Sequence, residues 1–170
     1  IVPHKLQRVE LRSDGKGVSV FQQKLRGLIT TGVSNETTID AIRKGGEDKK
    51  NVVKEMMLAD LGICNVVLSG TKEKPIVSTV HQLTDDNGNQ KQYTLQLGQE
   101  SVGTQRFFSR IGLWMDAMNS GAVLVVDEIE ASMHPLLTRH LIEMIQDQTI
   151  NQNHAQLIFT THDTGLLDLK

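Results

Sequence analysis

Two short apolar runs near the C-terminus, with a helical stretch between them, limit the possible folds more than any other feature of the chain. The runs are Val123 to Val126 and Gln156 to Thr160. The stretch between them, Pro135 to Gln148, begins with proline, which suits a first helical position because its missing N–H is not needed there. Strands that are apolar throughout are typical of parallel sheets with both faces covered. The segment therefore predicts a parallel β-α-β unit and an α/β fold class.

The earlier part of the chain shows first a helical and then a strand-like pattern. From Thr37 to Gly62 the apolar residues recur at roughly helical spacing. The stretch RKGGEDKKN interrupts them, and we interpret it as a charged connector between helices or a solvated arm. Residues 1–34 predict short strands or loops. We expect residues 1–62 to form an N-terminal segment with a helical arm, and residues 63–170 to form a C-terminal lobe.

That lobe begins with runs that are typical of strands: CNVVLSG, KPIVSTVHQL and KQYTLQL. The pair Asn87-Gly88 lies between the last two and suits a hairpin turn with positive φ. After Gly98 the pattern becomes helical, and we expect a helix from Thr104 to Met118.

The composition excludes several classes of function. With 170 residues, of which 38% are hydrophobic and 22% charged, the chain can bury the core of one globular domain. A net charge of −2 gives no support to nucleic-acid or membrane binding, and 4% aromatic residues disfavour a platform that stacks RNA bases. No apolar run approaches the ~20 residues that span a bilayer. Cys64 is the only cysteine, which excludes an internal disulfide and suits a reducing, cytoplasmic environment.

Polar side chains follow both strands of the predicted β-α-β unit. Asp127 and Glu128 come directly after the first strand, and Thr160, Thr161 and His162 stand at the end of the second. Because ligands of open α/β sheets bind beyond the carboxyl ends of the strands, these groups should meet in one crevice. Phosphoryl transfer can use such groups: a carboxylate that holds Mg²⁺ through water, a second that polarises the attacking water, and an imidazole near the γ-phosphate.

Each feature also has a plainer explanation. Two acids after a strand are more often a cap or an ion-pair partner, and a lone histidine there is more often structural. Ser101 and Gly103 lie just before the helix expected from Thr104, whose free N–H groups could bind an anion. Serine at a helix start commonly serves only as an N-cap.

Taken together, three segments resemble the second half of an ABC-type ATPase head. ESVGTQR resembles the signature motif, AVLVVDEIEASMHP the Walker B motif and D-loop, and QLIFTTHDTGLLD the switch-histidine loop, in the right order. The likeness covers about residues 98–168 and is strongest to the soluble AAA-labelled proteins of abortive-infection and OLD-type phage-defence systems. It implies a P-loop NTPase-like fold with a partly parallel sheet and flanking helices.

The resemblance also implies roles for the matching residues. Asp127 would anchor the Mg²⁺ of Mg-ATP through water, Glu128 would be the catalytic base, and His162 would be the switch residue at the γ-phosphate. The residues that would contact ATP held by a partner chain are Ser101, Gly103, Thr104 and Gln105, with residues 131–134 at the interface. Such heads act as homodimers or higher homo-oligomers around ATP, and we expect this one to control an effector such as a nuclease.

The phosphate-binding loop of such a head is not found. The pattern GxxxxGK[ST] is absent, and in the nearest match Gly17 stands where Ser or Thr is needed and Glu10 where the first glycine belongs. For a Q-loop the candidates are Gln22 and Gln23. Because the chain begins with Ile1, we expect it to be part of a longer protein that carries the loop upstream, and this chain alone to be inactive.

Two other functions remain open. An SMC-like or DNA-repair head would share the chemistry but needs a long coiled coil. No heptad run of three or more repeats appears, and residues 37–62 are too short for such a coil. A non-catalytic scaffold would explain the missing phosphate loop, while Asp127, Glu128 and His162 argue against it. DNA binding is not supported by the net charge, and no segment for coupling to a membrane transporter is recognised.

Overall fold

The fold contains a small parallel sheet built around the C-terminal strands. The computed structural model describes residues 28–30, 34–60, 62–85 and 88–168. In this sheet β1 (Leu28–Thr30) pairs with β5 (Val123–Val126), which pairs with β6 (Gln156–Phe159), all in parallel. The helix α5 (Pro135–Gln146) joins β5 to β6, which confirms the predicted β-α-β unit. Both α5 and β6 end slightly earlier than the sequence pattern predicts.

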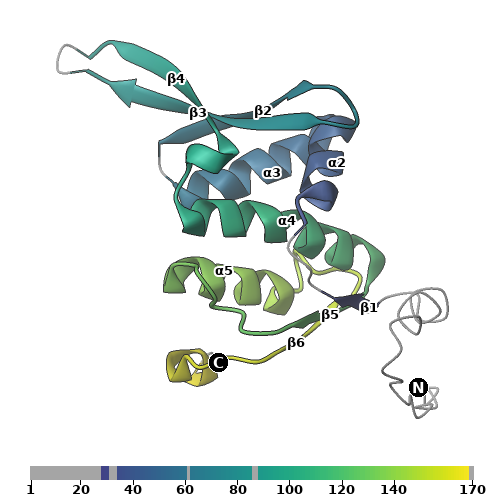
Figure 1. The fold of residues 1–170 in the computed structure, drawn as a ribbon. Coiled ribbons are helices and arrows are strands. Elements are labelled where there is room, and N and C mark those ends of the chain that lie inside the picture. The colour runs from purple at the N-terminus through teal and green to yellow at the C-terminus, as the bar shows by residue number, and fades with distance from the viewer. Residues whose placement is uncertain (1–27, 31–33, 61, 86–87, 169–170) are drawn as a thin grey trace, which may run out of the picture.

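A second sheet is antiparallel and consists of β2 (Ile63–Gly70), β3 (Pro75–Thr84) and β4 (Gln90–Gln96) in that order. The predicted hairpin is confirmed, with Gly88 at a φ of 80° in the turn between β3 and β4; Asn87 lies outside the described residues. The far end of this hairpin projects beyond the helices (Figure 1). A short 3₁₀ helix, Leu97–Gln99, then leads from β4 towards the next helix.

Two helices precede this sheet, and their boundary corrects one prediction. They are α2 (Glu36–Lys44) and α3 (Gly46–Ala59), separated only by Gly45, whose φ of 71° favours glycine. Gly45 is the predicted break between helices, but the charged residues on either side of it lie within α2 and α3 and not in a connector or arm. Glu47 and Asp48 occupy its first turn, where a negative charge interacts favourably with the positive end of the helix dipole.

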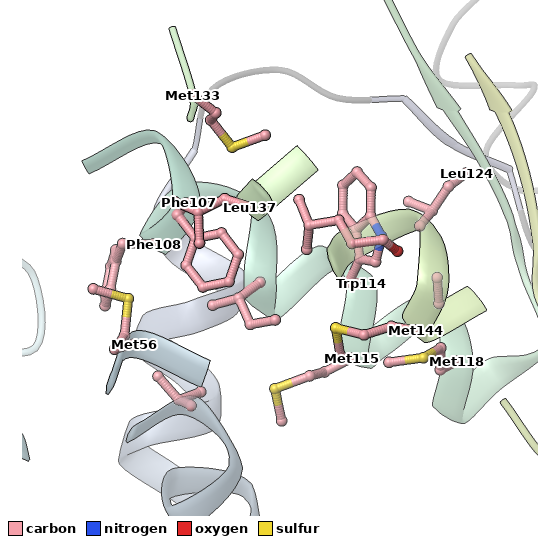
Figure 2. Packing of buried hydrophobic residues seen from close by; sticks show 14 of the residues in the cluster. Met56, Phe107, Phe108, Trp114, Met115, Met118, Leu124, Met133, Leu137 and Met144 are labelled. Atoms are coloured by element: carbon pink, nitrogen blue, oxygen red, sulfur yellow. The ribbon is translucent and has the colours of Figure 1, made fainter. Parts of the chain in front are cut away.

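The longest helix of the described residues is α4 (Val102–Ser120). It lies between two halves of the fold: α2, α3 and the antiparallel sheet on one side, and α5 and the parallel sheet on the other (Figure 1). It extends beyond the predicted bounds at both ends. Phe107, Phe108 and Trp114 on this helix are completely buried and form the centre of the core (Figure 2). The indole nitrogen of Trp114 donates to the carbonyl oxygen of Leu141 at 2.9 Å, so the buried N–H that joins α4 to α5 is satisfied.

The contact between α2 and α4 depends on a glycine. Thr38 is buried, and its hydroxyl donates to the carbonyl of Phe108 at 2.7 Å and accepts from the N–H of Gly112 at 3.1 Å. A Cβ on Gly112 would lie 2.4 Å from the backbone nitrogen of Thr38. The two helices can approach this closely only because position 112 has no side chain.

The segments named for a phosphate loop and a Q-loop, residues 13–17 and Gln22 with Gln23, lie outside the described residues. Within the described part of the chain, no helix has both the length and the apolar character that a membrane span requires.

Candidate functional site at the ends of β5 and β6

The segments that follow β5 and β6 stay hydrogen-bonded to one another after the strands end. Val126 and Phe159 are paired in the parallel register. The N–H of Thr160 donates to the carbonyl of Val126, and the N–H of Ile129 donates to the carbonyl of Thr160, both at 3.1 Å. Residues 127–130 and 160–162 therefore lie side by side at one edge of the sheet, as the topology predicts.

Thr160 connects the two acids that follow β5. Its hydroxyl donates to Oδ1 of Asp127 at 2.5 Å and accepts from the backbone N–H of Glu128 at 2.8 Å. Glu128 has a φ of 47°, in the left-handed region that a residue with a side chain rarely adopts. The hydroxyl thus supports a strained turn and fixes the carboxylate of Asp127 with the same atom.

His162 is an exposed neighbour of Glu128. Its Nε2 is 3.5 Å from Oε1 of Glu128, and the two side chains are 85% and 57% exposed. An ion pair this exposed adds little to stability. Both groups are open to a ligand, and the structure brings together Asp127, Glu128 and His162, the three residues that the sequence analysis assigned to catalysis and Mg²⁺.

Glu130 is a further residue of this site, for which the sequence analysis proposed no role. Its Oε1 accepts from the backbone N–H of His162 at 2.6 Å. This bond is the main reason why the pKa of Glu130 lies below its ordinary value; burial opposes the shift and the Thr161 hydroxyl adds to it. The other oxygen, Oε2, is buried without a hydrogen-bond partner among the described residues. Glu130 therefore holds the backbone of the segment that resembles the switch-histidine loop, through a contact too distant along the chain for a local pattern to reveal.

Arg110 ties α4 to the same loop. Its Nη1 donates to the carbonyl of Ile129 and lies 3.7 Å from Sδ of Met133. Burial lowers the pKa of Arg110, and nearby Arg106 lowers it further, while Glu130 opposes both effects. An arginine remains charged despite such a shift. The loop after β5 is thus anchored by β6 on one side and by α4 on the other.

The segment that resembles the signature motif forms the start of α4. Ser101 is the N-cap: its Oγ accepts from the N–H of Thr104 at 3.1 Å and lies 2.8 Å from the Thr104 hydroxyl. Thr104 is buried, and the amide of Gln105 donates to the carbonyl of Glu100 at 2.8 Å. The structure therefore confirms the plainer explanation, that Ser101 caps the N-terminus of α4. The exposed surface of this helix end is formed by Ser101 and by Val102, which is 61% exposed.

The signature segment lies beside the loop that resembles the D-loop but not in the network of the acids. A Cβ on Gly103 would come within 3.6 Å of the carbonyl oxygen of Ser132. Among the described residues, no hydrogen bond or ion pair joins residues 101–105 to Asp127, Glu128 or His162. The two predicted parts of an ATP site, residues 101–105 and the group of Asp127, Glu128 and His162, are therefore separate within one chain.

The donor atoms at the strand ends suit Mg²⁺ bound together with a nucleotide. In the described part of the chain, no group of three or more His, Cys, Asp or Glu side chains is placed to hold a metal ion. Mg²⁺ does not need one, because it commonly takes one or two carboxylates and completes its shell with water and phosphate oxygens. Asp127, with Glu128 next to it, provides such a carboxylate set.

Comparison with known proteins identifies a family match over most of the chain. A family model described as "AAA domain, putative AbiEii toxin, Type IV TA system" matches residues 14–168. This range includes the strand ends, the loop after β5 and the start of α4. A search of curated proteins found no match.

Proposed function

The chain belongs to this AAA-domain family of type IV toxin–antitoxin systems, and from that premise we propose that it is the ATP-binding and ATP-hydrolysing module of a soluble ABC-type ATPase. The module dimerises around Mg-ATP and controls an effector. The observation that carries the proposal is the bridge made by Thr160, which fixes Asp127 and Glu128 side by side at the carboxyl ends of parallel strands. That is the edge at which α/β folds bind their ligands.

Asp127, Glu128 and His162 have different roles in the proposed hydrolysis of ATP. Asp127 would hold Mg²⁺ through water, and a bound ion would supply positive charge near the phosphate oxygens. Glu128 orients the attacking water and accepts its proton, and its exposure leaves room for that water. His162, an exposed neighbour of Glu128, donates to the γ-phosphate oxygens. The chain's own contribution is to keep these groups in fixed positions before the nucleotide arrives.

A second chain completes the site in this proposal. The free N-terminus of α4, with Ser101 exposed, suits an anion that approaches from outside the chain. Because residues 101–105 are not connected to the acids of their own chain, the ATP that they contact is held by the partner. The family description, which names a toxin of a type IV system, supports control of an effector in abortive infection.

The test is Glu128→Gln in the full-length protein, with Glu143→Gln, an exposed change on α5, as the control. Loss of the general base should reduce the kcat for ATP hydrolysis by about 10²- to 10⁴-fold. The affinity for Mg-ATP should remain, since Asp127 is unchanged. Turnover that persists in Glu128→Gln, or ATP binding that disappears with it, would remove Glu128 from the role of base.

A further inference from the structure

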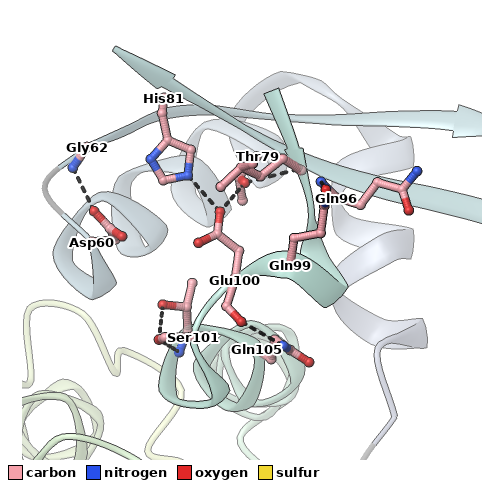
Figure 3. A network of polar contacts seen from close by, with 11 residues as sticks. Asp60, Gly62, Thr79, His81, Gln96, Gln99, Glu100, Ser101 and Gln105 are labelled. Atoms are coloured by element: carbon pink, nitrogen blue, oxygen red, sulfur yellow. Dashed lines mark hydrogen bonds and ion pairs between the residues drawn. The ribbon is translucent and has the colours of Figure 1, made fainter. Parts of the chain in front are cut away.

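A buried ion pair involves Glu100, the first residue of the segment ESVGTQR that resembles the signature motif. Glu100 precedes Ser101, and its Oε1 lies 2.6 Å from Nε2 of His81 on β3. The hydroxyl of Thr79, also on β3, donates to the same oxygen. Figure 3 shows Thr79 and His81 both directed at Glu100. The side chains of His81 and Glu100 are each only 4% exposed. A carboxylate in such a place needs its partners, because burial of an unpaired charge is strongly unfavourable.

The imidazole of His81 is itself held in one position. It stacks on the ring of Tyr93 on β4, with centroids 5.0 Å apart and planes at 15°. Its Nδ1 faces Gly62, where a Cβ would lie only 3.0 Å away. The antiparallel sheet therefore presents Nε2 to Glu100 with little freedom to move.

The backbone on both sides of Glu100 is fixed as well. Its carbonyl accepts from the side-chain amide of Gln105 at 2.8 Å, which links it to the first turns of α4. Upstream, Oε1 of Gln99 accepts from the N–H of Gln96 at 2.9 Å and closes the turn that leaves β4 (Figure 3). Glu100 is thus attached to β3 through its side chain and to α4 through its carbonyl.

We propose that the cluster of Thr79, His81 and Glu100 positions the start of α4, so that Ser101 and Gly103 meet the ATP of the partner chain in the correct register. The inference rests on the proposed function, since it concerns the composite site formed by two chains. His81 and Glu100 are positioning residues: they touch no nucleotide and act through the backbone of residue 101.

The chain contains a matched control for this pair. His140 on α5 and Glu55 on α3 make the same contact, Nε2 to a carboxylate oxygen at 2.6 Å, away from the signature segment. His81→Ala and His140→Ala each remove the imidazole from a histidine–glutamate pair. His81→Gln keeps an N–H donor near the place of Nε2 and should rescue the positioning.

Two measurements on the full-length protein test the proposal. The first is amide hydrogen exchange at residues 101–105, which His81→Ala should accelerate and His140→Ala and His81→Gln should not. The second is ATP turnover and ATP-dependent dimerisation. His81→Ala should lower kcat by about 10- to 100-fold, the loss typical of a small misplacement of a reacting group, and should weaken dimerisation. The affinity of a single chain for ATP should not change.

The outcomes separate positioning from general stability. Equal exchange at residues 101–105 in His81→Ala and His140→Ala, or equal losses of kcat, would overturn the proposal. If His81→Ala does not fold, Thr79→Val, which removes one bond to Glu100, takes its place in the same comparison. A wild-type protein without ATP turnover would reject the proposed function, whereas the exchange comparison would still decide whether the cluster positions residue 101.

Discussion

A single hydroxyl, that of Thr160, sets the geometry of the two acids at the candidate site. Thr160→Val keeps the shape of the side chain but removes the donor to Asp127 and the acceptor for the N–H of Glu128. The strained turn at Glu128 then loses its support, so the carboxylates should drift from their positions. We expect kcat for ATP hydrolysis to fall by about 10- to 100-fold. Because Asp127 is the residue proposed to hold Mg²⁺, the affinity for Mg-ATP should fall as well.

Thr149→Val is the matched control for that change. The hydroxyl of Thr149 donates to Oδ1 of Asp147 at 2.6 Å, in the exposed turn after α5. This variant loses a similar threonine–aspartate bond that does not belong to the hydrogen-bond network of residues 127–130 and 160–162. Equal turnover in the two variants would show that the bridge made by Thr160 has no special part in catalysis.

The carboxylate of Glu130 should make stability depend on pH. Its pKa is lowered in the folded protein, chiefly by the N–H of His162, so the ionised form favours folding. This contribution is complete above the ordinary glutamate value of 4.5 and is lost as pH falls through the lowered value. Glu130→Gln resembles the protonated side chain. The difference in the free energy of unfolding between wild type and Glu130→Gln should therefore be present at neutral pH and shrink in acid.

Urea unfolding of both proteins at neutral pH and at several pH values below 4.5 measures this difference. The comparison cancels the other titrating groups, because they are common to the two proteins. A difference that stays constant across this range would mean that the bond to His162 does not stabilise the ionised form of Glu130.

Among the helices, the contact of α2 with α4 is the one most sensitive to a single methyl group. In Gly112→Ala the new Cβ would meet the backbone nitrogen of Thr38 at 2.4 Å and its hydroxyl oxygen at 2.5 Å. Neither helix can yield without breaking the bonds between Thr38 and α4. Overpacking of this kind costs about 1–3 kcal/mol, and chemical denaturation should show a loss of that size.

Gly98→Ala is the control, because a Cβ there meets nothing within 4 Å. Its unfolding free energy should stay within about 0.5 kcal/mol of wild type, as at other surface positions. If Gly112→Ala is equally stable, then α2 and α4 must pack with more freedom than their hydrogen bonds indicate.

The sequence predicts those elements whose signals are local. The span of β5 was predicted as observed, because a short apolar run followed by acids has few alternatives. The sequence pattern favours a connector for the charged residues at the start of α3, which are helical in the structure, since their helical state depends on the dipole of the helix and on packing of its later residues. Other contacts join residues from different elements, so no local pattern predicts them. They are the bond from His162 to Glu130 and the pair of His81 with Glu100.

At the scale of the whole molecule, α4 connects the antiparallel sheet to the loop after β5 and fixes their relative positions. Its first turn is attached to the antiparallel sheet through Glu100, and farther along the helix Arg110 is bonded to the loop after β5. The start of α4 and the acids after β5 are therefore placed by one rigid element, although they share no direct contact. This arrangement suits a dimer in which each ATP is enclosed by the acids of one chain and the helix start of the other.

Mixing two inactive variants tests that arrangement. Ser101→Arg damages the contact with the partner's ATP, and Glu128→Gln removes the base, so each full-length variant alone should be inactive. In a mixed dimer one site receives both lesions and the other receives neither. With equal amounts and random pairing, half of the dimers are mixed and each has one intact site, so the mixture should regain about a quarter of wild-type turnover. If each chain carried its whole site, the mixture would remain as inactive as its components.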